Sequence, residues 1–95
     1  MSNPLHSSLN RDSLTVMTHT EAREYIAAEA RAALARDGRS AAQLAEAAGI
    51  PRSSLSKKLR GLVSFTVEEV VAIAVALDID PAALVPQTAP RSAAA

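Results

Sequence analysis

The chain contains no cysteine and no tryptophan, and its aromatic residues are one tyrosine and one phenylalanine. Without cysteine it has neither disulfide bonds nor thiolate zinc sites, so close packing of its elements has to stabilise it. The absence of cysteine is also typical of a reducing compartment. With 2% aromatic residues, the core has to consist of leucine, isoleucine, valine and alanine. This composition, rich in alanine, predicts an all-α fold.

Long apolar runs and an excess of charge are also lacking. The run from Val70 to Leu77 is far shorter than the roughly 18 residues that cross a membrane. The N-terminus lacks the layout of a signal peptide. Ten Lys and Arg balance ten Asp and Glu over 95 residues, the size of one small domain. We therefore expect a cytoplasmic protein without a membrane partner.

Patterns typical of catalysis or metal binding are missing as well. There is no Gly-rich phosphate loop, no nucleophile elbow and no pairing of Cys with His. His6 and His19 lie without clustered carboxylates, which leaves too few ligands for a metal. We expect no enzyme activity, no cofactor and no metal site.

Three regions differ in their residue pattern. Residues 1–18 show no sustained periodicity and predict a flexible N-terminal arm. Residues 19–85 contain short helical segments separated by turn signals, and these predict the folded domain. Residues 86–95 are rich in proline and alanine, which predicts a disordered tail.

Capping signals divide the domain into five expected helices. A Thr or Ser followed three residues later by Glu or Gln occurs at Thr18, Ser40 and Thr66, and this pattern is a capping box. Pro51 and Pro81 suit the first turns of the other two helices. The β-branched residues of the fourth segment are also compatible with a buried strand, but its alanines and its cap favour a helix. The expected helices span residues 19–37, 41–48, 52–60, 67–77 and 81–84.

Two of these helices, 41–48 and 52–60, are joined by a tight turn at Gly49 and have the spacing of a helix-turn-helix. In the second helix, Leu55 and Leu59 should face the core, and Leu62 should continue the same stripe. From Gly49 to Phe65 the chain has four basic residues and no acid, although it is neutral as a whole. DNA binding requires such a basic face, because only the cations that touch the duplex neutralise phosphates.

Over residues 22–85 the chain resembles the phage-repressor-like helix-turn-helix family, the Cro/C1 type also called XRE. The resemblance lies in SAAQLAEAAGIPRSSLSKKLRG, residues 40–61, and FTVEEVVAIAVAL, residues 65–77. It implies a compact five-helix, lambda-repressor-like DNA-binding domain whose third helix enters the major groove of duplex DNA. The framework positions that it implies are Leu44, Ala45, Gly49, Leu55, Leu59, Gly61 and Leu77.

The resemblance also implies DNA contacts on and before the third helix. The base-reading residues would be Arg52, Ser53, Ser54 and Lys57, and the phosphate contacts would be Ser40, Lys58 and Arg60. Arginine is the commonest bidentate partner of guanine, and this chemistry suits Arg52 at the start of the third helix. A cation at a helix N-terminus opposes the helix dipole, so Arg52 points to function. Cations in the last turn suit the dipole whatever the function, so the other basic residues are weaker signals.

Three positions depart from the family pattern. Ala41 stands where the family often has glutamine, so that phosphate contact is missing or passes to Ser40 or Arg39. Lys58 replaces an apolar residue and has to extend past the edge of the core or point at DNA. Pro51 replaces a small polar cap, so sequence readout could shift by a residue.

Two hypotheses of function follow. The first is a phage or bacterial repressor, Cro-like and nucleoid-associated, that binds a palindromic operator. Because one helix reads only a few base pairs, it should be a homodimer, with helix 67–77 or helix 81–84 as the seam. The second is an antitoxin-like module in which residues 1–18 hold a toxin or another regulator and DNA binding is secondary. We favour the first, because only residues 1–18, with Leu5, Leu9 and Leu14, offer a segment outside the domain for such a partner.

Overall fold

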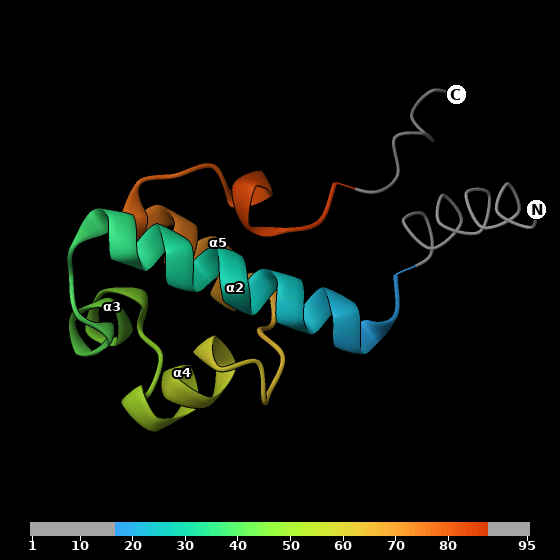
Figure 1. The fold of residues 1–95 in the computed structure, drawn as a ribbon. Coiled ribbons are helices and arrows are strands. Elements are labelled where there is room, and N and C mark those ends of the chain that lie inside the picture. The colour runs from blue at the N-terminus through green and yellow to red at the C-terminus, as the bar shows by residue number, and fades with distance from the viewer. Residues whose placement is uncertain (1–16, 88–95) are drawn as a thin grey trace, which may run out of the picture.

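The computed structural model describes residues 17–87 and shows an all-α fold (Figure 1). Its elements are α2 (His19–Asp37), α3 (Ala41–Ala48), α4 (Arg52–Leu59), α5 (Val67–Leu77) and the 3-10 helix η1 (Pro81–Leu84). The predicted fold class is confirmed. The predicted count of five helices needs a correction, because the last is a single 3-10 turn and residues 17–87 therefore contain four α-helices. Almost all of the predicted arm and tail lies outside this range.

The helix starts form as the capping signals predict. The Thr66 hydroxyl accepts a hydrogen bond from the Glu69 N–H at 3.1 Å, and a Glu69 carboxylate oxygen accepts one from the Thr66 N–H at 2.8 Å. The same reciprocal pair of bonds begins α2 at Thr18 and α3 at Ser40. Each box satisfies backbone N–H groups that have no partner within the helix. Among the helices of residues 17–87, only α4 begins without a side-chain cap, at Pro51.

Glycines in the left-handed conformation end α2 and α3, and a third follows α4. Gly49 has a φ of 73°, and the chain then turns so that the Ile50 N–H reaches the Ala45 carbonyl oxygen at 3.0 Å. After α4, Gly61 has a φ of 79° and the Leu62 N–H bonds the Lys57 carbonyl oxygen, which is a Schellman motif. This turn leads Leu62 away from the stripe of α4. The prediction that Leu62 faces the core is wrong, since it is 60% exposed.

The core lies between α2, α3, α4 and α5, and Leu84 of η1 packs into it from the side of α2 and α5. The largest fully buried side chains are Leu44, Leu55, Ile73 and Leu84. From α2 the fully buried side chains are all alanines, at positions 27, 30 and 33, so its backbone approaches its neighbours closely. Among residues 17–87 no polar or charged residue is buried. No helix in that stretch is both long and apolar enough to cross a membrane.

Candidate nucleic-acid interface

The two helices of the predicted helix-turn-helix, α3 and α4, pack against each other. In Figure 1 they lie on one side of α2, and η1 lies on the other. Leu55 and Leu59 are buried and fix the inner face of α4, as their spacing predicts. Because that face is fixed, Arg52, Ser53 and Lys57 point outward, whereas Ser54 and Lys58 are partly buried.

The outer face of α4 collects the predicted base-reading residues. Arg52, Ser53 and Lys57 are exposed, and Ser54 is half-buried. Arg60, a predicted phosphate contact, is the C-cap residue of the helix and is also exposed. No structural finding assigns these residues to DNA, so their contacts stay predictions.

The cations between residues 39 and 60 fall into two groups by their ion pairs. Within residues 17–87, Arg52, Lys57 and Arg60 form no ion pair, whereas Arg39 and Lys58 each pair with an acid. The unpaired group lies on the outside of α4 and the paired group joins elements to one another. Unpaired exposed cations remain free to neutralise phosphates, and they lose no intramolecular partner when they do so.

Lys58 makes such a pairing contact. Its Nζ lies 2.6 Å from both carboxylate oxygens of Glu69, and its side chain is only 12% exposed. Burial alone would raise the pKa of the Glu69 carboxyl, but the hydrogen bonds from Lys58 and Thr66 outweigh burial and lower it. The predicted phosphate contact of Lys58 is untested, and this ion pair gives the residue a role within the fold.

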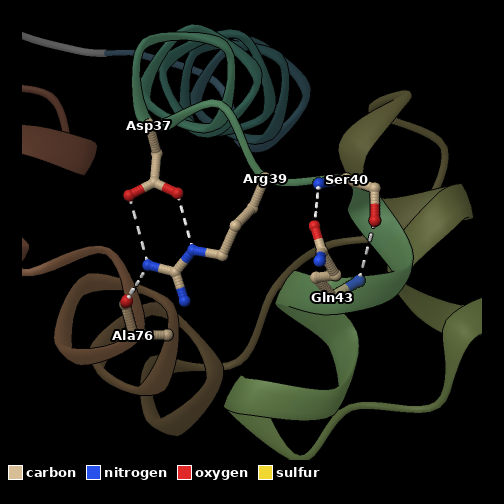
Figure 2. A network of polar contacts seen from close by, with 5 residues as sticks. All are labelled: Asp37, Arg39, Ser40, Gln43 and Ala76. Atoms are coloured by element: carbon tan, nitrogen blue, oxygen red, sulfur yellow. Dashed lines mark hydrogen bonds and ion pairs between the residues drawn. The ribbon is translucent and has the colours of Figure 1, made fainter.

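Arg39 and Ser40 lie at the start of α3, and Figure 2 shows their contacts. The Arg39 guanidinium donates to the Asp37 carboxylate, with Nε at 2.6 Å, and to the carbonyl oxygen of Ala76 on α5. The hydrogen bond from Arg39 holds the pKa of Asp37 below its ordinary value. The Ser40 oxygen accepts from the Gln43 N–H at 3.1 Å, which leaves its own O–H free to donate.

Sequence reasoning missed two arginines of α2. The Arg31 Nη1 donates to the Leu59 carbonyl oxygen at 2.6 Å, and the Arg23 Nε donates to the Gly61 carbonyl oxygen at 2.8 Å. Both bonds join α2 to the end of α4 across 28 and 38 residues of chain. No local pattern signals contacts over such separations.

Comparisons with known proteins agree with this geometry. A family model described as Helix-turn-helix matches residues 31–84, which is more than half of the chain. The crystal structure of the restriction-modification controller protein C.AhdI from Aeromonas hydrophila is similar, with 27% identity and a TM-score of 0.63. That match covers 65% of this chain and 94% of the other. A comparison with curated protein sequences gives no significant match. The chain therefore belongs to the Cro/C1-type helix-turn-helix family, and it is a DNA-binding transcriptional regulator.

Proposed function

We propose that the protein represses transcription by binding a palindromic duplex operator as a homodimer, with α4 of each copy in the major groove. One observation carries the proposal: the basic residues on the outside of α4 have no acidic partner within residues 17–87, whereas Arg39 and Lys58 are paired. Such a surface attracts duplex phosphates and releases their counterions. Action on DNA places the protein in the cytoplasm, at the nucleoid.

The proposed DNA contacts of each residue follow from its position on α4. Arg52 stands at the first turn, where recognition helices contact base edges, and its guanidinium suits guanine O6 and N7. Ser53, Ser54 and Lys57 complete the base-reading set. The phosphate contacts are Arg60 and the Ser40 hydroxyl. We place Lys58 at the edge of the interface, because its charge is already satisfied by Glu69.

The dimer seam proposed here is α5. Val67, Val71 and Val75 recur every four residues along one face of that helix, and all three are exposed. The stripe continues into an apolar groove lined by Phe65, Val67, Val71 and Val85 among others. Leu84 of η1 is buried in its own domain and is unavailable to a partner. A second copy is the occupant that a two-fold symmetric operator requires.

The antitoxin-like alternative has less support. The family match spans the DNA-binding domain, and a similar solved structure is that of a controller protein. Residues 1–16, on which a toxin contact would depend, lie outside the described part of the chain.

The DNA proposal is tested by selecting bound sequences from a randomised duplex and measuring fluorescence anisotropy at several salt concentrations. Affinity should fall with a log–log slope of about 0.9 per phosphate neutralised. Arg52→Ala should weaken operator binding about tenfold or more, the value of one good bidentate contact. Arg36→Ala is the control, because Arg36 is also exposed but lies in the last turn of α2. Equal losses in both variants, or duplex binding without salt dependence, would contradict the proposal.

The seam is tested by analytical ultracentrifugation of two matched variants. Val71 and Val63 are 43% and 42% exposed, but only Val71 lies on the α5 stripe. Val71→Lys should therefore convert the dimer to a monomer, while Val63→Lys should leave it intact. A dimer that survives Val71→Lys would exclude this face of α5.

A further inference from the structure

The C-terminal end of α4 is held by bonds from its own turn and from α2. Helices end with carbonyl groups that lack intrahelical partners. The turn after α4 satisfies two of them, because the Gly61 and Leu62 N–H groups donate to the Lys58 and Lys57 carbonyl oxygens at 3.0 Å. The Leu59 carbonyl oxygen instead accepts from Arg31 at 2.6 Å. One residue beyond the helix cap, the Gly61 carbonyl oxygen accepts from Arg23 at 2.8 Å.

These two bonds attach α4 to α2 at two separate points. Arg23 and Arg31 are eight positions apart on α2, or about 12 Å along the helix axis. Between them, Ala27 packs close to the turn, since a Cβ placed on Gly61 would lie 3.7 Å from the Ala27 Cβ. Alanine side chains set the spacing of two helices but interlock little. The directional bonds of the two arginines therefore add to the core contacts of Leu55 and Leu59 in setting the direction of α4.

We propose that Arg23 and Arg31 are positioning residues that set the angle of α4 in the DNA groove and thereby its sequence specificity. This inference rests on the proposed function of α4. The anchor lies at the C-terminal end, about 10 Å along the axis from Arg52. A tilt of about 10° at the anchor would move Arg52 by about 2 Å, more than the ~0.5 Å that precise contact geometry tolerates. Phosphate contacts tolerate a larger displacement of α4, because a flexible charged side chain can still reach the DNA backbone.

The test compares Arg31→Ala with Arg36→Ala, a second arginine of the same helix that forms no ion pair within residues 17–87. Affinity is measured for the selected operator and for an unrelated duplex of equal length, at several salt concentrations and well below the unfolding temperature. Arg31→Ala should lower the ratio of the two affinities about tenfold and leave the salt slope unchanged. Arg36→Ala should leave the ratio unchanged. Arg31→Lys, which keeps the charge, should recover part of the ratio.

Two results would overturn the inference. If both affinities fall together and the slope drops by about 0.9, Arg31 is itself a phosphate contact. If the ratio stays at the wild-type value, Arg31 only stabilises the fold.

A second readout needs no DNA. Amide hydrogen exchange of the free protein should show faster exchange at Arg60, Gly61 and Leu62 in Arg31→Ala than in Arg36→Ala. Unchanged exchange at these amides would show that Arg31 does not hold the end of α4 and would also overturn the inference. If the wild-type protein binds no duplex, the proposed function fails, and the exchange data alone decide whether Arg31 anchors α4.

Discussion

Lys58 and Glu69 join α4 to the start of α5: the Lys58 Nζ lies 2.6 Å from both Glu69 carboxylate oxygens. Glu69 belongs at the same time to the capping box of α5, because its carboxylate accepts from the Thr66 N–H. One carboxylate thus stabilises a helix start and a contact between helices. Lys57, the preceding residue, is exposed and forms no ion pair within residues 17–87.

Substituting these adjacent lysines should separate DNA binding from stability. Lys57→Ala should weaken binding to the selected operator about tenfold, because one base-reading contact is lost. It should change the free energy of unfolding by less than about 0.5 kcal/mol. Lys58→Ala should keep the salt slope of duplex binding and destabilise the fold by about 1 kcal/mol, since Glu69 loses its partner. Anisotropy titrations and urea unfolding measure the two effects. A lower slope in Lys58→Ala would support the phosphate contact predicted from the sequence.

Glu69→Gln should show a destabilisation that depends on pH. The pKa of Glu69 is lowered in the folded protein, so its charged form stabilises the fold above the unfolded pKa of about 4.3. That contribution is lost as the pH falls through the lower folded pKa. Urea unfolding from pH 7 to pH 3 should therefore show the largest difference from wild type near neutrality and little at the acid end. Glu68→Gln removes the same charge from the same turn without breaking an ion pair, and it should destabilise less at pH 7. A difference independent of pH would show that charge is not the cause.

Ser40→Asp tests whether the start of α3 faces a phosphate. Aspartate caps helices as well as serine does, so stability should change by less than about 0.5 kcal/mol. If the Ser40 hydroxyl lies against the DNA backbone, the new carboxylate should weaken duplex binding about tenfold through repulsion. Thr66→Asp makes the matching change at the cap of α5 and should leave DNA affinity unaltered. Equal binding by Ser40→Asp and wild type would remove Ser40 from the interface.

Asp78→Asn should stabilise the domain. Asp78 is the C-cap of α5 in the left-handed conformation, with a φ of 58°, and its negative charge opposes the helix dipole there. Asparagine tolerates this conformation and has no charge, so we expect a gain of about 0.5 kcal/mol. Asp80 caps η1, because its carboxylate accepts a hydrogen bond from the Ala82 N–H at 2.9 Å. Asparagine can cap in the same way, so Asp80→Asn should change the free energy of unfolding little. Thermal and urea unfolding would compare the two, and equal effects would contradict the dipole argument.

Features that depend on residues close in sequence were predictable. A capping box spans four positions, and all three boxes form where the sequence predicts them. The left-handed turn at Gly49 and the buried pair Leu55 and Leu59 likewise follow from local spacing. The prediction for Leu62 is wrong, because helical periodicity does not continue past Gly61, where the Schellman turn changes the direction of the chain.

Partners of long polar side chains were not predictable. Lys58 forms an ion pair with Glu69, which lies 11 residues further along the chain. Arg31 donates a hydrogen bond to the carbonyl oxygen of Leu59, which lies 28 residues further along. Such contacts depend on how whole helices pack. The sequence pattern around a cation on a helix surface is the same whether its partner is a carboxylate, a carbonyl group or solvent. Only the fold separates the cations that hold the domain together from those left free on α4.

The cations on the outside of α4 are different residues from those that join the helices, and this affects how such a regulator evolves. Arg52, Ser53 and Lys57 are exposed and form none of the ion pairs that join the helices within residues 17–87. Substitutions at positions of this kind cost at most about 0.5 kcal/mol of stability. With the role of α4 proposed above, a lineage that descends from this protein would acquire new operators by single substitutions at these positions with little loss of stability.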